Sequence, residues 1–383
     1  MNRMFDYTPK QLELQKKVRT FLKEYIDPIA REVDANGELP LSVLEAWKEA
    51  GLACLVAPKE VGGPELDTIT CTMILEELGY ADLGTATALG ANSLCSYPVL
   101  IAGTPAQKKK HFGPLLEGNY GAFALTEPNA GSDTGAIATT ARREGEEYVL
   151  NGTKCFITQG GVAATYVLFA STDKIKGTKG LSAFIVEREL PGLSTGKVEN
   201  KMGIRASNTV ELILENVRIP ASCLLGNEGD GMKLAMMSLD SGRLMVAAQA
   251  VGVAQRALDE CVSYVKERMD NGEPMASQQA VAFKIADMAT SLEASRLLVR
   301  RGAVLKDAHQ PYSQHSAMTK LFCTDMAIQV AKDAMDIMGN YGYTKDAYIE
   351  KIWRDARILS IYEGTNQVQK VVISGALLKK TKH

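Results

Sequence analysis

The sequence predicts a mainly α protein with a β domain in the middle of the chain. In the first and last parts, apolar residues recur at spacings of three and four, which is typical of amphipathic helices. Between them, β-branched and aromatic residues gather in short runs bounded by turn residues, as strands do. The Gly-x-Gly-x-x-Gly pattern of an alternating βα nucleotide fold is absent. We therefore expect three units, residues 1–119, 120–229 and 230–383.

The first unit is expected to consist of helices. Helical spacing covers residues 11–33, 41–50, 67–79 and 106–117. Proline and glycine residues separate these segments. The stretch 11–33 is predicted as one long helix.

The middle unit is expected to form strands, and the last unit helices. In "YVLNGTKCFI", residues 148–157, Asn151 and Gly152 stand between two β-rich runs, which is a strong signal for a hairpin turn. Three further stretches continue the strand pattern: "YVLFAST" (166–172), "LSAFIVE" (181–187) and "VELILENVRIP" (210–220). After "GNEGDG", helical spacing returns over residues 232–268, 279–308, 313–338 and 367–380.

The composition argues against several classes of function. Lys and Arg number 43 against 45 Asp and Glu, so no excess positive charge is present for binding nucleic acid or a bilayer surface. No apolar run approaches the ~20 residues of a membrane span, and the first residues lack the apolar core of a signal peptide. The seven cysteines and four histidines show no metal-ligand spacing, and isolated cysteines in odd number fit reduced thiols. We expect a cytoplasmic protein without a metal site.

Two stretches are candidate ligand loops. In "ALTEPNAGSDTGA", residues 124–136, Gly131 lets backbone N–H groups approach a ligand closely, and Thr126, Ser132 and Thr134 offer hydroxyls. Such a loop suits a phosphate or the polar edge of a ring, but its composition also fits an ordinary turn. The arm "FITQGG", residues 156–161, pairs an aromatic side chain with a hydroxyl and suits a flat ring, or it is a plain strand end.

Five stretches in this order resemble the acyl-CoA dehydrogenase family, and the resemblance covers nearly the whole chain. They are "APKEVGGPELD" (57–67), "ALTEPNAGSD" (124–133), "NGTKCFITQGG" (151–161), "KMGIRASNTVELILENVRIP" (201–220) and "YGYTKDAYIEKIWRDARILSIYEGTNQ" (341–367). The resemblance implies an N-terminal helical domain, a central β-barrel-like domain and a C-terminal four-helix-bundle domain. It further implies FAD as cofactor, an acyl-CoA substrate, electron-transfer flavoprotein as acceptor, and a homotetramer.

Glu363, in "IYEGTNQ" (361–367), matches the catalytic base of the family. Removing the α-proton of a thioester needs a carboxylate that is ionised yet desolvated, and an apolar pocket raises the pKa of a glutamate from about 4.3 toward the working range. The resemblance implies that the backbone N–H of Glu363 and a hydroxyl of FAD hold the thioester carbonyl, that flavin N5 takes the β-hydride, and that the product is a 2-enoyl-CoA. The residues alone also fit a glutamate that caps the last helix.

The resemblance implies further ligand contacts. Toward the flavin these are Phe123, Ala124, Leu125, Thr126, Gly131, Ser132, Phe156, Ile157, Thr158, Thr365 and Gln367. Toward the FAD of a neighbouring subunit they are Arg268, Gln279, Asp336, Gly339 and Asn340. Toward acyl-CoA they are Ser132, Asp240, Arg243, Tyr362 and Gly364. For Asp240 and Arg243, an ion pair on one helix face is the alternative.

Three positions depart from the family pattern. Asn271 replaces an aromatic residue, Asp336 a glutamine and Asn340 a glycine, all in the part that grips the AMP half of FAD. A lost aromatic contact costs about 1 kcal/mol or more, and an acid beside a pyrophosphate is unfavourable. The replacements predict weaker FAD binding, or compensation by neighbouring side chains.

The stretch "LDSGRLMVAAQAVGVAQ", residues 239–255, looks most like the short-chain branch, which includes butyryl-CoA dehydrogenases. A short, branched or cyclic acyl group is therefore expected. Four functions stay open: an acyl-CoA dehydrogenase of fatty or carboxylic acid degradation, the same site run backwards as an enoyl-CoA reductase, an acyl-CoA oxidase, and a non-catalytic CoA-binding partner subunit with weakened FAD binding.

Overall fold

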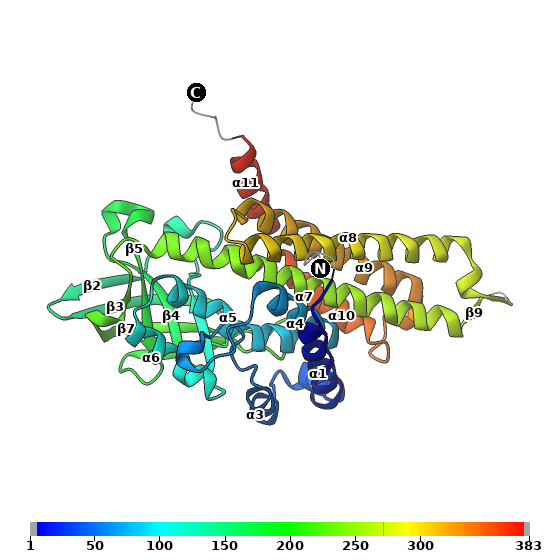
Figure 1. Ribbon diagram of the computed structural model, residues 1–383, viewed down its shortest axis with the longest axis horizontal. Helices are drawn as coiled ribbons and strands as arrows, with labels where there is room; N and C mark the ends of the chain where they lie inside the picture. The colour runs from blue at the N-terminus through cyan, green and yellow to red at the C-terminus, as the bar shows by residue number, and fades with distance from the viewer. Residues whose placement is uncertain (1–5, 271, 379–383) are drawn as a thin grey trace.

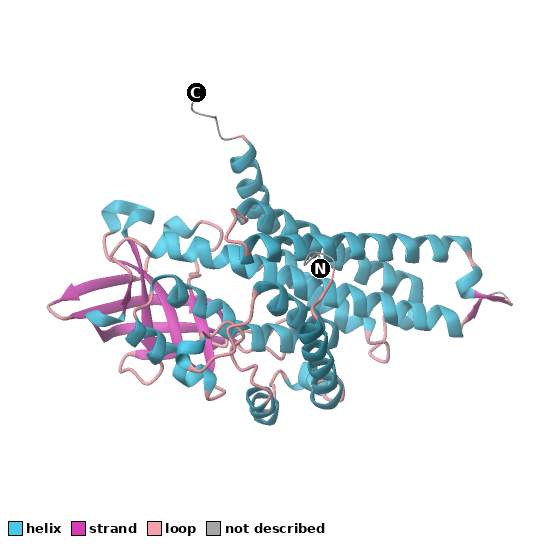
Figure 2. Cartoon of the chain, in the orientation of Figure 1, coloured by secondary structure: helices cyan, strands magenta, loops and turns pink. Residues whose placement is uncertain are grey.

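The computed structural model describes residues 6–270 and 272–378. A β sheet lies at one end of an elongated molecule, long helices run from it toward the other end, and the N-terminal helices pack along their side (Figure 1). The strands gather in this one region, apart from a short hairpin at the far end (Figure 2). The predicted class, mainly α with a β middle domain, is confirmed. Residues 1–119, 120–229 and 230–383 remain our proposal for the domain boundaries.

The N-terminal unit consists of helices, four of which are capped at their starts by local side chains. Its elements are α1 (Pro9–Tyr25), α2 (Ala30–Asn36), α3 (Leu41–Glu49), α4 (Thr68–Ala81), α5 (Leu83–Ala102) and α6 (Pro105–Leu116). Before α1, the Thr8 hydroxyl accepts from Gln11 N at 3.2 Å, and the Gln11 side chain accepts from Thr8 N at 2.9 Å. Asp82 caps α5 by accepting from Thr85 N at 2.7 Å.

The single helix predicted over residues 11–33 is wrong, because the helix is interrupted between Tyr25, where α1 ends, and Ala30, where α2 begins. Pro28 lies in the break. A proline has no backbone N–H to donate, and its ring clashes with the carbonyl one turn earlier, so the helix stops before it.

The middle unit is one sheet of eight strands within the described residues. They are β1 (Tyr120–Ala124), β2 (Thr140–Glu144), β3 (Glu147–Thr158), β4 (Ala163–Ser171), β5 (Leu181–Glu187), β6 (Leu193–Val198), β7 (Thr209–Pro220) and β8 (Leu224–Leu225). The order across the sheet is β6-β7-β3-β2-β4-β5-β8, and β1 pairs with β4 in parallel. The chain leaves β1 at Ala124 and enters the loop that begins at Leu125.

The hairpin turn predicted at Asn151 and Gly152 is wrong. β3 runs straight through both residues, and the tight turn lies at Gly145, between β2 and β3. The pairing of β3 with β7 shifts register at the predicted turn, where Asn151 faces two residues of β7, Glu215 and Asn216, so the β-bulge lies on β7. Glycine is required at residue 152, because a Cβ there would lie 2.4 Å from Thr139 Oγ1.

The C-terminal unit is built on long helices. They are α7 (Gly231–Glu267), α8 (Gln279–Asp307), α9 (Ser313–Gly342), α10 (Ile349–Ala356) and α11 (Asn366–Leu377), and strands β9 (Met269–Asp270) and β10 (Glu273–Pro274) connect α7 to α8. α7 has 37 residues, and it extends about 55 Å at the usual helical rise. It runs from the sheet to the far hairpin, whereas α11 projects away from the bundle (Figure 1).

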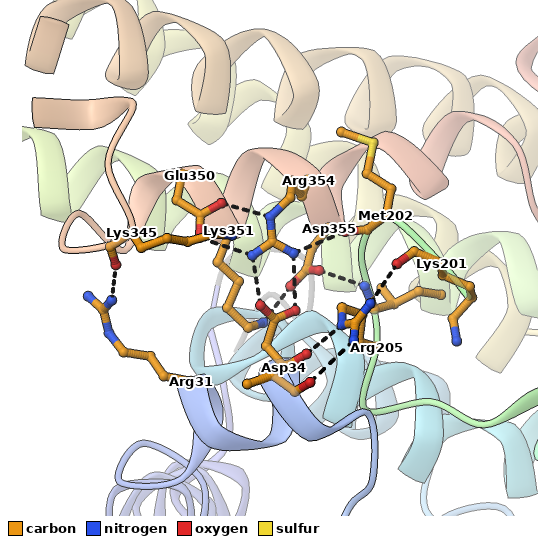
Figure 3. A network of polar contacts seen from close by, with 12 residues as sticks. Arg31, Asp34, Lys201, Met202, Arg205, Lys345, Glu350, Lys351, Arg354 and Asp355 are labelled. Carbon is orange, nitrogen blue, oxygen red and sulfur yellow. Dashed lines mark hydrogen bonds and ion pairs between the residues drawn. The ribbon is translucent and has the colours of Figure 1, made fainter. Parts of the chain in front are cut away.

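Buried charges tie the three units together (Figure 3). Lys351 of α10 pairs with Asp82 of the N-terminal unit and, at 2.6 Å, with Asp355. The backbone N–H of Ile204, from the β unit, donates to Asp355 at 2.6 Å. Beside them, Arg354 pairs with a carboxylate of α2 at 2.7 Å. One short helix therefore contacts both other units through charged groups.

Candidate active site

Glu363 lies in a strained turn just before α11. The chain leaves α10 through the short 3-10 helix Arg357–Ser360, and then Glu363 and Gly364 take left-handed φ angles of +55° and +84°. This conformation costs a residue other than glycine about 1 kcal/mol or more, so surrounding contacts must hold it. Thr365 ends the turn, because its hydroxyl accepts from Val368 N at 3.3 Å and caps α11.

The carboxyl group of Glu363 is buried against α7. Its Oε2 has no hydrogen-bond partner among the described residues. A Cβ at Gly242 would lie 2.5 Å from this oxygen, so the carboxyl group fits only because residue 242 lacks a side chain. Burial raises the pKa of Glu363 to about 7, and the charges of Arg243 and Lys320 oppose the rise. A base poised near neutral pH suits proton abstraction.

Tyr362 ties this turn to two helices. Its hydroxyl donates to Gln249 Oε1 at 3.3 Å, and Gln249 Nε2 donates to the Ala86 carbonyl at 3.0 Å. These bonds link the turn to α7 and α5, which limits its freedom to move.

Asp240 and Arg243 form the ion pair that their spacing on α7 allows. Arg243 Nη1 and Asp240 Oδ1 are 2.5 Å apart, and Ser313 Oγ donates to the same oxygen at 2.9 Å. Arg243 Nε is buried and, within the described part of the chain, has no partner. Buried polar atoms are nearly always paired, so this donor and the free Glu363 oxygen indicate a place where a polar ligand binds.

A cavity of about 1090 Å³ opens beside the ion pair. Tyr97 and Leu100 of α5 and Met237 and Met245 of α7 line it, together with Asp240. A mainly apolar cavity of this size with a few polar groups is typical of small-molecule sites. Leu100 and Met237 escaped prediction because an apolar residue on a helix has the same pattern whether it lines a cavity or the core.

A buried ion pair holds the loop that was predicted to bind flavin. Lys154 Nζ donates to Glu127 Oε1 at 2.7 Å and to the Leu125 carbonyl at 3.0 Å. The Glu127 carboxylate also accepts from Ala138 N and Thr139 N at 2.7 and 3.1 Å. This pair was not predicted from the sequence, because Lys154 follows Asn151, Gly152 and Thr153 in a polar stretch where an exposed lysine is ordinary.

The aromatic arm and the loop come together. Cys155 N donates to the Thr126 carbonyl at 2.9 Å. Next to it, Phe156 is 63% exposed and has a φ of +54°. An aromatic side chain held outward in a costly backbone conformation suits the face of a flat ring. Gly131 has open space where a Cβ would stand. These residues fit a flavin.

The loop also packs against the start of α7. Thr134 Oγ1 donates to Met232 Sδ at 3.7 Å. Gly242, beside the Glu363 carboxyl group, is about 15 Å further along the same helix. The loop predicted to bind flavin and the Glu363 carboxyl group therefore both lie against α7.

A second group of predicted cofactor residues lies at the other end of the bundle. It comprises five exposed residues at the end of α7, the start of α8 and the end of α9: Arg268, Gln279, Asp336, Gly339 and Asn340. The neighbouring hairpin β9 marks this end (Figure 1). Nearly the whole length of α7 separates these residues from Thr126 and Phe156.

The structure bears on the departures from the family pattern. Asp336 pairs with Lys332 at 2.6 Å, which partly offsets its negative charge. Arg268 lies over the rings of Tyr264 and Tyr341, 5.1 and 5.8 Å from their centroids. The predicted loss of an aromatic contact at residue 271 lies outside the described residues.

In the described ranges, no helix has the length and apolar character needed to cross a membrane. In those ranges, no group of His, Cys, Asp and Glu side chains is placed to hold a metal ion.

Comparison with known proteins places the chain in a family. Residues 8–119, 122–217 and 229–378 match the N-terminal, middle and C-terminal domains of acyl-CoA dehydrogenases. A short-chain specific acyl-CoA dehydrogenase of Clostridium acetobutylicum is 44% identical over 98% of this chain and 100% of its own length. The chain belongs to the acyl-CoA dehydrogenase family and is similar to its short-chain branch. It is an oxidoreductase that acts on CH–CH groups, with FAD as cofactor.

Other relatives extend the range of functions. An acryloyl-CoA reductase (NADH) of Anaerotignum propionicum is 45% identical over 99% of this chain and 98% of its own. The butyryl-CoA dehydrogenase of Megasphaera elsdenii has a TM-score of 0.95 at 41% identity, covering 98% of this chain and 100% of that one. A chain from the structural study of the electron transferring flavoprotein of Acidaminococcus fermentans has a TM-score of 0.96 at 45% identity, with the same coverage.

Proposed function

We propose that this protein converts a short or compact acyl-CoA to the 2-enoyl-CoA, with Glu363 as the base. The observation that carries the proposal is the Glu363 carboxyl group, whose buried Oε2 lacks a partner among the described residues and lies against Gly242, next to Ser241 of the cavity wall. Its pKa of about 7 leaves a substantial ionised fraction at neutral pH. The substrate's α-proton would pass to this carboxylate.

The chain's other residues position and shield the reactants. Asp240 at the cavity wall would bind the polar part of CoA, while the apolar side chains of α5 and α7 exclude water from the acyl group. The backbone N–H of Glu363 would donate to the thioester carbonyl and stabilise the negative charge that develops there. FAD, when bound, supplies the acceptor for the β-hydride, held by the loop around Thr126 and the arm at Phe156.

We further propose that the working form is a homotetramer. The five cofactor candidates at the far hairpin are separated from Thr126 and Phe156 by nearly the length of α7. Both groups can serve one FAD only if it lies between two subunits. Sedimentation analysis with and without FAD tests this, and a monomer that binds FAD fully would contradict it.

A Glu363→Gln variant tests the base. We expect flavin reduction by acyl-CoA to slow by about 10² to 10⁴-fold, because the amide cannot take the α-proton. The amide has nearly the same shape, so FAD content and acyl-CoA binding should stay close to wild type. Rapid-mixing absorbance of the flavin, under anaerobic conditions, measures the rate with butyryl, branched and cyclic acyl-CoAs.

The matched control for this variant is Glu13→Gln, which changes an exposed glutamate of α1 that pairs with Lys17 at 2.9 Å. It should reduce flavin at the wild-type rate. Normal reduction in Glu363→Gln would remove the base assignment. A protein that stays colourless with added FAD would instead favour the non-catalytic partner subunit.

The reverse reaction is a second candidate, favoured by the 45% identity to an acryloyl-CoA reductase. The same carboxyl group, when protonated, would return a proton to the α-carbon. Comparing the reduced protein mixed with enoyl-CoAs against the oxidised protein mixed with acyl-CoAs decides the favoured direction. We propose electron-transfer flavoprotein as the electron carrier, and its reduction in a coupled assay tests this. Formation of peroxide without it would indicate an oxidase.

A further inference from the structure

Lys320 is a fully buried lysine that touches the turn carrying Glu363. It lies on α9 with 0% of its surface exposed. Its ammonium donates to the Gly364 carbonyl at 2.9 Å and to Asn366 Oδ1 at 2.8 Å. Both acceptors are neutral oxygens, so these contacts do not neutralise the buried charge. An apolar residue would fill the same place at lower desolvation cost, which calls for a role for the ammonium.

The contacts of Lys320 fall where the backbone is strained. Glu363 and the glycine after it both have left-handed φ angles. The Gly364 carbonyl between this strain and α11 accepts from Lys320 at 2.9 Å and from Gln369 Nε2 at 2.7 Å. Two donors on one carbonyl fix the direction of the Gly364–Thr365 peptide, the second peptide after the base. Gln369 Nε2 also donates to the Glu363 carbonyl at 3.2 Å, so the peptides on both sides of Gly364 are held and the backbone that carries the Glu363 side chain has little freedom to turn.

Asn366 extends the same support into α9. Its Nδ2 donates to Asp325 Oδ1 at 2.7 Å and to Thr324 Oγ1 at 3.0 Å. The Asn366 side chain is therefore bonded to three residues of α9: Lys320, Thr324 and Asp325. The turn is braced against α9 by a buried hydrogen-bond network, whereas its other side rests on Gly242 of α7.

Lys320 also places positive charge near the Glu363 carboxyl group. Three charged groups lie around it: Glu363 on the turn, Arg243 on α7 and Asp325 on its own helix. Burial lowers the pKa of Lys320 to about 8, while Glu363 and Asp325 oppose the fall. Burial raises the pKa of Glu363 to about 7. Between these values Glu363 is largely ionised while Lys320 is still largely charged.

We propose that Lys320 is a positioning residue for Glu363, holding the strained turn through the Gly364 carbonyl and favouring the ionised carboxylate by its charge. This inference rests on the proposed function, because it assigns Lys320 a task only if Glu363 is the base. In the holoenzyme, flavin reduction should rise with pH as Glu363 loses its proton. It should fall again at higher pH as Lys320 loses its own.

Two variants separate the hydrogen bond from the charge. Lys320→Met removes both, whereas Lys320→Gln removes the charge and keeps a donor of shorter reach. Amide hydrogen exchange of residues 361–370 in the FAD-saturated protein measures the turn without any turnover. We expect exchange to speed up by about tenfold or more in Lys320→Met and less in Lys320→Gln, because a lost brace lowers the cost of local opening.

The pH profile of flavin reduction measures how the charge of Lys320 affects the ionisation of Glu363. In both variants the acidic midpoint should move up by about one pH unit, a roughly tenfold change in the ionisation constant. The fall at high pH should disappear. Lys16→Met, which removes an exposed lysine from α1, is the control and should match wild type in exchange and profile.

The outcomes distinguish this inference from the proposed function. If Lys320→Met and Lys320→Gln both keep the wild-type exchange of residues 361–370 and the wild-type midpoint, Lys320 only fills space and the inference is overturned. A uniform loss of FAD content with an unmoved midpoint overturns it as well. If Glu363→Gln reduces flavin normally, the base assignment fails, while the exchange measurement still decides whether Lys320 braces the turn.

Discussion

At the scale of single residues, Glu363 combines two unfavourable features. Its backbone is in the left-handed region, and its Oε2 is buried without a partner in the described structure. Each costs free energy of folding, and neither improves the packing of the turn. A residue that weakens the fold in two ways has its explanation in chemistry, which agrees with the proposed role as a base.

The burial of Glu363 predicts a pH-dependent cost to stability. Its pKa is about 7 in the folded chain against an ordinary value of 4.5. The folded state therefore binds the proton more tightly, so stability falls as pH rises from about 4.5 to about 7. Glu363→Gln should remove this fall and stabilise the protein by about 2 to 3 kcal/mol above neutral pH. Urea unfolding of FAD-saturated wild type and variant at about pH 5 and 8 measures the difference. An unchanged pH dependence would contradict the buried carboxyl group.

At the scale of elements, β3 shows how a local signal is overruled. Asn-Gly favours a two-residue hairpin turn, but here the flanking strand pairs with β7 on both sides of the dipeptide. The sheet keeps β3 continuous, and β7 has one extra residue opposite Asn151 as a bulge. The continuous strand places Lys154 against the loop predicted to bind flavin, and Phe156 beside that loop.

Gly152→Ala should destabilise the protein by about 1 to 3 kcal/mol, because the new methyl group overlaps a neighbouring strand segment. The added Cβ would lie 2.4 Å from Thr139 Oγ1, at a φ of +151°. The matched control is Gly113→Ala, because Gly113 lies within α6 and has nothing within 4 Å of a Cβ. It should be neutral or stabilising by up to about 1 kcal/mol. Urea unfolding measures the stability of both variants, and equal stabilities would argue against the close approach of residue 152 to Thr139.

At the scale of the whole molecule, the units are joined through charge as well as apolar packing. Lys351 and its two carboxylate partners are each no more than 5% exposed. A buried pair of this kind is weak evidence for net stability, because desolvation offsets attraction. Replacing the lysine alone is different, because it leaves the carboxylates of Asp82 and Asp355 buried near each other without a positive charge.

Lys351→Met should therefore destabilise the protein by about 3 to 5 kcal/mol at neutral pH. Burial already raises the pKa of Asp355, and Lys351 opposes that rise. Without the lysine the carboxyl group takes up a proton more readily, so the loss should shrink as pH falls. Lys345→Met removes an exposed ion pair of the same region and should cost less than about 1 kcal/mol. Unfolding at about pH 5 and 7 measures both, and equal losses would contradict the network.

The sequence by itself determined the class of fold, the family and the candidate base. Long helical periodicity and strand runs are local patterns, and family motifs such as those around Thr126 and Glu363 are read residue by residue. The break at Pro28 was readable too, but a continuous apolar spacing on both sides concealed it.

Only the tertiary structure decided which groups meet. The continuity of β3 through Gly152 depends on pairing with a distant strand, and the contact of Lys320 with the Gly364 carbonyl joins residues 44 positions apart. The space for the Glu363 carboxyl group depends on Gly242 of another helix. The separation of the two sets of cofactor candidates follows from the direction of α7. Such features arise from contacts between distant segments, which local periodicity does not encode.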